Sequence, residues 1–268
     1  TYTGTYVFVA MLFYAFELYC DFTGGIDITI GIAEVLGIKM PENFNLPYFS
    51  KNIKEYWNRW HMTMGTWFTD YIFYPISVCG PMLKISKWSR KHLGEFIGKR
   101  VPVYLSSFIV WLTTGIWHGA AWNYVLWGLY FGIFLIMERL FLKKWLEKLP
   151  RVISHVYVTV VVLFSFLVFS AASPMDAVMQ FGGMLGLNGG PLWNGESLYV
   201  LRSCGVILLA ALVGAMPTVP YVISKLRMNQ KCEAVLSVLQ PIVTAALLLA
   251  STAFLVAGSF NPFLYWQF

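Results

Sequence analysis

The chain has 268 residues and a net charge of +6, and 58% of its residues are hydrophobic whereas only 12% are charged. This balance excludes an ordinary soluble domain, in which about a quarter of the residues carry charge. The positive charge does not indicate a nucleic-acid partner, because the Lys and Arg residues fall in loops between apolar stretches. The composition therefore predicts an integral protein of the lipid bilayer with basic cytoplasmic loops.

Several apolar stretches are long enough to cross a hydrocarbon core of about 30 Å. We expect membrane spans at 4–20, 101–117, 121–141, 153–172, 199–222 and 234–257. Positive charges gather in the loops at 84–100, 139–151 and 225–231, which places these loops in the cytoplasm. The predicted fold class is all-α: a polytopic, multi-helix membrane protein with a single domain over 1–268. No basic segment precedes the first span, so we expect that an N-terminal part is missing.

The region from residue 17 to 77 is only mildly apolar, and acidic residues, glycines and prolines interrupt it. Irregular backbone at membrane depth must be buried in protein or line a wet cavity, so we expect re-entrant or interfacial helices here. Residues 52–73 are predicted to form one such helix, with Asn52 as its cap and Glu55 three residues later, as in a capping box. Large apolar residues recur along it at three- and four-residue spacing, and His61 lies within it.

Between Val101 and Met137 the chain has no Asp, Glu, Lys or Arg. One helix of that length would measure about 55 Å, so the segment must turn back on itself. The small residues "HGAA" at 118–121 are the expected turn, with Gly119 free to adopt a positive φ. Gly128 and Gly132 form a GxxxG pattern, which predicts close approach of a neighbouring helix.

His118 is the one ionisable acid or base in "TTGIWHGAAWNYVLWG", and three interpretations of it compete. It is a hydrogen-bonded structural residue, a metal ligand, or a catalytic acid or base. The four histidines lack the spacing of a metal site, which disfavours a metal ligand. An imidazole with an ordinary pKa of about 6.5 is well suited to exchange protons near neutral pH. The residues alone leave the structural and catalytic interpretations open.

Four segments carry a family resemblance: "YCDFTGGIDITIGIAEVLGIKMPENFNLPY", "WNRWHMTMGTWFTDYIFYPIS", "TTGIWHGAAWNYVLWGLYFG" and the terminal "NPFLYWQF". In order and spacing they resemble the membrane-bound O-acyltransferases. The similarity is to the bacterial branch that modifies cell-surface polymers, which includes alginate O-acetyltransferases and D-alanyl-teichoic acid transferases. It covers residues 14–140 and the last ten residues.

The resemblance implies two catalytic histidines. The family histidine of the WHG motif matches His118, and the histidine after WNRW matches His61. Four further residues are our own candidates for a supporting or substrate-binding role: Trp117, Trp60, Asp70 and Asn123. Asp70 and Asn123 are candidates for hydrogen bonds that fix the rings. Their alternatives are structural: Asp70 caps a helix or pairs with a cation, and Asn123 satisfies hairpin backbone.

The resemblance also implies a reaction. An acyl group, with acetyl expected, passes from a cytoplasmic thioester such as acetyl-CoA to a hydroxyl of a cell-surface polysaccharide or to an extracytoplasmic acyltransferase partner. No bound cofactor or metal is expected, and the bacterial cytoplasmic membrane is the expected location. Thr69 and "PISVCG" depart from the acetylating pattern around Asp70, so D-alanyl transfer to teichoic acid stays an alternative. A non-enzymatic transporter and an assembly scaffold are alternatives from other classes.

Overall fold

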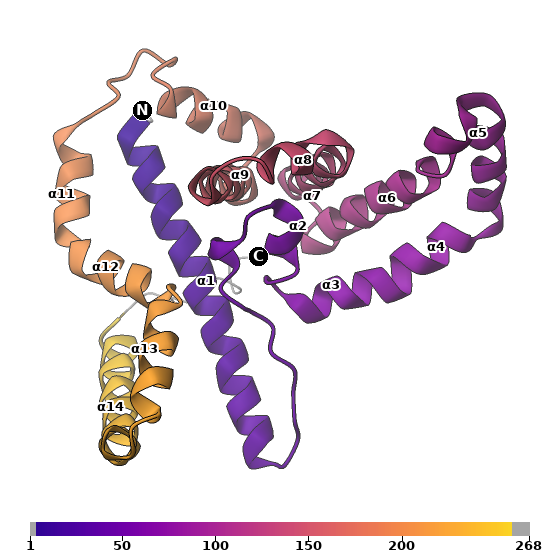
Figure 1. Ribbon diagram of the computed structural model, residues 1–268. Helices are drawn as coiled ribbons and strands as arrows, with labels where there is room; N and C mark the ends of the chain where they lie inside the picture. The colour runs from indigo at the N-terminus through magenta and orange to yellow at the C-terminus, as the bar shows by residue number, and fades with distance from the viewer. Residues whose placement is uncertain (1–3, 259–268) are drawn as a thin grey trace. The chain divides into compact units, whose positions relative to one another are not determined.

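A computed structural model describes residues 4–258 of the chain, and the described part is helical, without a β-strand (Figure 1). The terminal "NPFLYWQF" motif lies outside the described residues. The chain divides into two compact units, Thr1–Gly205 and Val206–Phe268. The all-α prediction is confirmed.

The first unit contains eleven α-helices in its described part. They are α1 (Gly4–Val35), α2 (Ile53–Trp57), α3 (Met62–Phe68), α4 (Tyr74–Val78), α5 (Gly80–Gly98), α6 (Val101–His118), α7 (Trp122–Met137), α8 (Lys143–Leu146), α9 (Arg151–Ser170), α10 (Pro174–Met184) and α11 (Gly195–Ser203). A 3-10 turn, η1 (Pro47–Phe49), and two π-helical segments, η2 (Thr69–Phe73) and η3 (Glu138–Leu142), complete the unit. Helix α7 packs between α6 and α9, and α1 packs against α9 and α10 (Figure 1).

Helix α1 is longer than expected and passes through Gly24 and Gly25 without a break. The prediction that this part of the chain is interrupted is therefore wrong. A glycine costs a helix interior only about 1 kcal/mol, which the apolar turns on either side offset. Polar side chains also bond to the helix itself: the Thr23 hydroxyl donates to the Tyr19 carbonyl at 2.6 Å. The irregular backbone starts only after Val35.

Four helices in the described residues are long and apolar enough to cross a membrane, or five if the bent pair α11 and α12 counts as one span. The four are Gly4–Val35, Trp122–Leu146, Arg151–Ser170 and Gln230–Ala257. At four of the predicted spans, 4–20, 121–141, 153–172 and 234–257, the structure therefore has a helix that could cross a membrane. The predicted span at 101–117 is helix α6, which is not among the four.

The predicted span at 199–222 is not one helix. It is divided among α11, α12 (Gly205–Gly214) and α13 (Thr218–Arg227), with breaks at Cys204 and before Thr218. Pro217 lies in the second break, where its fixed φ and missing N–H oppose a continuous helix. In the second unit α13 packs against α14 (Gln230–Ala257). There Arg227 Nη2 donates to Gln240 Oε1 at 2.8 Å.

Helices α6 and α7 form the predicted hairpin, since α6 ends at His118 and α7 begins at Trp122. The predicted close approach is also confirmed: a Cβ on Gly128 would lie 2.3 Å from the Trp111 carbonyl oxygen. The prediction that Gly119 uses the positive-φ region open to glycine is wrong, because its φ of 161° lies close to 180° and is extended backbone. Glycine is required there for space, since a Cβ would lie 2.6 Å from ring carbons of Tyr124.

Candidate active site

The segment that carries His61 is broken at that residue. Asn52 caps α2 as predicted, because its Oδ1 accepts from the Glu55 backbone N–H at 2.8 Å. The Glu55 carboxylate accepts from the Lys51 N–H and not from that of Asn52. However, α2 ends at Trp57, and α3 begins only after His61, whose φ of 45° is left-handed. The prediction of one helix over 52–73 is therefore wrong.

A distant loop causes this break. The Asn45 N–H donates to the Arg59 carbonyl at 2.9 Å, and the Met62 N–H donates to the Asn43 carbonyl at 3.0 Å. These bonds satisfy backbone groups that a continuous helix would satisfy internally. The Asn43 side chain is buried, and its Oδ1 lies 3.2 Å from Nδ1 of His61. Sequence reasoning missed Asn43, although it lies in the quoted segment "PENFNLPY".

Aromatic rings surround His61. The ring of Phe22 meets it edge-on with centroids 4.7 Å apart, and the ring of Phe44 stacks on it at 6.4 Å. The predicted supporting residue Trp60 is buried and packs edge-on against Phe44. Burial lowers the pKa of His61 from 6.5 to about 4, because desolvation disfavours the charged ring. His61 is therefore a neutral imidazole near pH 7.

His118 lies at the last turn of α6, among the rings of Trp117, Trp127 and Phe169, with centroids 4.9, 4.7 and 5.3 Å away. Its Nε2 is buried and has no hydrogen-bond partner among the described residues. Like His61, it lies outside the four candidate spans. Burial lowers its pKa to about 4, and the repulsion that protonated His61 would exert is a second, smaller cause. The structure therefore brings two neutral histidines into one region.

The other predicted site residues differ in how directly they contact the two histidines. Asn123 is buried, and its Nδ2 donates to the carbonyls of Phe169 and Ala171 at 3.1 and 3.2 Å. It thus ties down the end of α9, whose Phe169 ring contacts His118. Trp117 contacts His118 directly but is 58% exposed. Asp70 is exposed within η2, and no hydrogen bond from it to either histidine is formed in the described residues.

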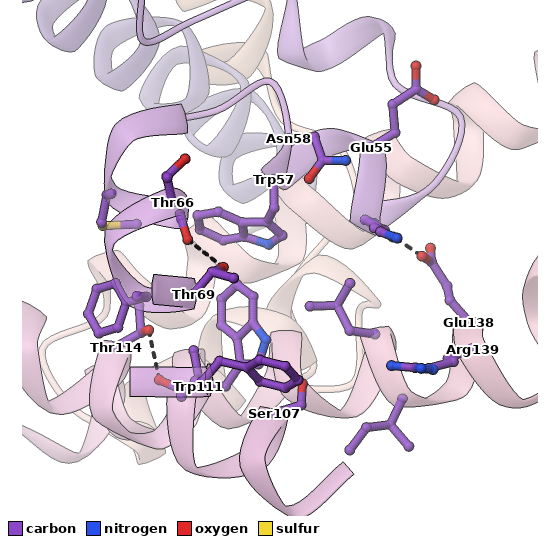
Figure 2. A pocket seen from close by; sticks show the side chains of 18 of the residues that line it. Glu55, Trp57, Asn58, Thr66, Thr69, Ser107, Trp111, Thr114, Glu138 and Arg139 are labelled. Carbon is purple, nitrogen blue, oxygen red and sulfur yellow. Dashed lines mark hydrogen bonds between the residues drawn. The ribbon is translucent and has the colours of Figure 1, made fainter. Parts of the chain in front are cut away.

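A cavity of about 1280 Å³ is lined by residues of α2, α3, η2, α6 and η3 (Figure 2). Its lining includes the cations Lys54, Arg139 and Lys143, the hydroxyls of Thr66, Thr69, Ser107 and Thr114, and the rings of Trp57, Phe68 and Trp111. Neither histidine lines it. Met62 does, and it directly follows His61, while Thr114 lies one turn before His118. The cavity wall therefore includes a residue close in the chain to each catalytic candidate.

Glu138 fixes the start of α2 against this cavity. Its carboxylate accepts from the backbone N–H groups of Ile53 at 2.6 Å and Lys54 at 3.1 Å, and the second bond is drawn in Figure 2. Glu138 is only 4% exposed. Sequence reasoning missed this link because the partners lie 85 and 84 positions apart.

Residues 1–174, which hold both histidines, match the family model of the membrane-bound O-acyltransferases. The chain belongs to this family. It is 33% identical to the peptidoglycan O-acetyltransferase of Helicobacter pylori over 181 residues, which cover 66% of this chain and 31% of that protein. It is also 35% identical to the teichoic acid D-alanyltransferase of Bacillus subtilis over 160 residues, which cover 58% and 38%.

A longer match joins the chain to a probable alginate O-acetylase of Azotobacter vinelandii. The two are 28% identical over 285 residues, which cover 96% of this chain and 54% of the relative. The chain thus spans about half or less of the length of these curated relatives. The family assignment confirms the resemblance seen in the sequence motifs.

Proposed function

We propose that this chain carries the acid–base centre of a membrane O-acyltransferase that moves an acyl group, with acetyl expected, from a thioester to a hydroxyl of a cell-envelope polysaccharide. The observation that carries the proposal is the buried, unpartnered Nε2 of His118 at the end of α6. Buried polar atoms are almost always hydrogen-bonded in native proteins, so one left open is available to a substrate. The proposed location is the bacterial cytoplasmic membrane.

In the proposed reaction the neutral His118 acts as general base. It removes the proton of the acceptor hydroxyl as that oxygen attacks the thioester carbonyl carbon. A carbon–oxygen bond forms, the carbon–sulfur bond breaks, and the imidazolium returns its proton to the departing thiolate. The aromatic rings around His118 exclude water, which favours transfer to the acceptor over hydrolysis.

The cavity of Figure 2 is the proposed donor side. Arg139 and Lys143 belong to the basic cluster at 139–151, and Lys54 adds a third cation to the lining. The lining also holds three carboxylates, of which Glu55 pairs with Arg59 and Glu138 accepts from backbone N–H groups, while Asp70 is exposed. A thioester carried by acetyl-CoA or by a phosphopantetheine arm bears phosphate, which these cations would attract. The acceptor is the polysaccharide hydroxyl itself or an extracytoplasmic acyltransferase that completes the transfer.

D-alanyl transfer to teichoic acid is the second candidate. It is supported by the Bacillus subtilis relative, whose identity to this chain is as high as 35%. The two candidates differ in their donor, because D-alanyl transfer uses a carrier-protein thioester. The donor therefore discriminates between them.

The test uses membranes that contain the full-length protein bearing this chain, supplied with acetyl-labelled coenzyme A or with D-alanyl carrier protein. Label should enter base-labile ester on envelope polymer, and His118→Ala should abolish it while the protein still accumulates. His92→Ala is the matched control, since His92 is exposed on α5. If ester forms with D-alanyl carrier protein but not with acetyl-labelled coenzyme A, the result would favour D-alanyl transfer over acetyl transfer. Ester formation that survives His118→Ala would refute the proposal.

A further inference from the structure

The orientation of the Asn43 amide is fixed by a neighbouring backbone group. The Asn43 side-chain atom next to His61 is also 3.1 Å from the backbone N of Thr63 and 2.6 Å from the Thr63 hydroxyl. A backbone N–H can only donate, so the atom that faces it must be the amide oxygen. The alternative, in which the amide nitrogen faces Thr63, would set two donors, the amide NH₂ and the backbone N–H of Thr63, against each other.

This orientation determines the proton on His61. The Asn43 oxygen is an acceptor only, and it lies 3.2 Å from Nδ1 of His61. A hydrogen bond forms between them only when Nδ1 carries the proton. In a neutral ring the other nitrogen, Nε2, then has a free lone pair and serves as the acceptor.

We propose that Asn43 is a positioning residue that holds His61 in the Nδ1-protonated form and so keeps its Nε2 as a hydrogen-bond acceptor for acyl transfer. The part concerning acyl transfer rests on the proposed function; the protonation pattern does not. In free histidine the proton favours Nε2, so the Asn43 contact reverses the intrinsic preference of the ring.

The backbone supports this role. His61 adopts a left-handed conformation, with φ of 45°, which is uncommon outside glycine. The bond from the Met62 N–H to the Asn43 carbonyl and the bond from the Asn45 N–H to the Arg59 carbonyl hold the break on both sides. One loop therefore sets both the backbone conformation of His61 and the partner of its ring. The edge of Phe22 restricts the ring further.

The consequence for the reaction is that His61 can take up a proton only at Nε2. A thiol or hydroxyl that reaches it would donate to that atom, and the resulting imidazolium would be stabilised by its Nδ1–H bond to Asn43. This is the arrangement in which an orienting oxygen supports a base. The Nε2 of His118 likewise has no hydrogen-bond partner in the described residues and is open to a donor.

The first experiment measures the protonation pattern without any need for activity. The full-length protein, with ¹⁵N-labelled histidine, is placed in bilayers near pH 7, and His61 is assigned by the signal lost in His61→Gln. Solid-state NMR should show a protonated Nδ1 and an unprotonated Nε2. In Asn43→Leu the proton should move wholly or partly to Nε2. A wild-type ring protonated at Nε2, or a pattern unchanged by Asn43→Leu, would overturn the proposal.

The second experiment measures acyl transfer by the same variants. Asn43→Leu should lower kcat at least tenfold with little change in the KM for the donor, whereas Asn43→Asp, which keeps an oxygen acceptor, should restore most of the rate. Asn45→Leu is the matched control, because Asn45 is exposed two positions away in the same loop. Equal losses in Asn43→Leu and Asn45→Leu would contradict a specific role. If the wild type transfers no acyl group, the proposed function fails while the NMR result still decides the role of Asn43.

Discussion

The two histidines of the site are held in opposite ways. Three aromatic rings contact His118, and its Nε2 has no hydrogen-bond partner in the described part of the chain. The ring of His61 also lies among aromatic residues, but one of its nitrogens is bound to Asn43 from a separate loop. His118 is thus open to a substrate, whereas His61 is committed at one nitrogen. A single amide oxygen, which bonds to one neutral imidazole and not to the other, can therefore give two histidines of one region different roles.

The largest effect is expected from glutamine substitutions at the two histidines. Glutamine keeps hydrogen-bonding capacity but cannot exchange protons near neutral pH, so His118→Gln should lower the rate of acyl transfer by about 10² to 10⁴. His61→Gln should cost less if His61 only assists. Initial rates in membranes with matched protein levels measure both. If the wild type forms no ester but transports a substrate, and His118→Gln still transports it, then His118 has a binding role and the protein is a transporter.

The next effect is on pH dependence. Both rings have a pKa of about 4 in the folded protein, lowered by burial from 6.5, so both stay neutral well into the acid range. Transfer should therefore hold from pH 7 to about 5 and fall with a midpoint near 4, by up to tenfold per pH unit below it. A midpoint near 6.5 in the pH–rate profile would contradict the burial of these rings.

Stability should also decrease with falling pH, but over a higher window than the rate of transfer. The unfolded chain takes up protons on these rings as pH falls through 6.5, whereas the folded chain takes them up only near 4. The unfolded state thus binds more protons between these values, and the free energy of unfolding decreases as pH falls from about 6.5 to 4. Thermal unfolding in detergent at several pH values measures this change, and His61→Gln should reduce it.

A smaller effect is expected from filling the contact between α6 and α7. Gly128→Ala puts a methyl group against the Trp111 carbonyl and should destabilise the hairpin by about 1–3 kcal/mol. Gly24→Ala is the matched control, because a Cβ there meets nothing within 4 Å and should stabilise α1 by up to about 1 kcal/mol. Unfolding midpoints should move in opposite directions. The same shift in both variants would mean that the close approach is not needed.

The smallest effect is expected at the link between η3 and α2. Glu138→Gln keeps one acceptor oxygen but sets an amide NH₂ against one of the two N–H groups, so one of the bonds to Ile53 and Lys54 is lost and a loss of about 1 kcal/mol in the free energy of unfolding is expected. Glu147→Gln, which breaks an exposed ion pair with Lys143, should change stability by less than about 0.5 kcal/mol. If the two substitutions are equal in effect, Glu138 does not anchor α2.

Much of this arrangement could be predicted from the sequence, where the signal is local. The uncharged segment from Val101 to Met137 is too long for one crossing, and the small residues after His118 mark its turn, so the hairpin was predictable. The spacing of Gly128 and Gly132 indicated its close contact. In these cases the residues that decide the structure lie beside one another in the chain.

The remaining features depend on partners far away in the sequence. The break at His61 is imposed by Asn43 and Asn45, and no residue within 52–73 marks it, since Asn52 and Glu55 are good helix-start residues. Asn123 is a candidate from the sequence for a hydrogen bond to a histidine ring or to hairpin backbone, yet its amide bonds to the end of α9. The division of 199–222 was missed because apolar content outweighed the signal of Pro217.

The two π-helical segments have a consequence for how the chain tolerates changes in length. Each holds one residue more per turn than an α-helix would, and Thr69, Asp70 and Glu138 in these segments line the cavity. Deleting one residue from either segment would give ordinary α-helix, and because the wide turn already holds the extra residue, the later side chains of that helix would keep nearly the same direction. Single-residue deletions at 69–73 or 138–142 should therefore preserve helix content and leave the later side chains of the cavity wall in place, whereas a deletion in the regular part of a helix would rotate them by about 100°.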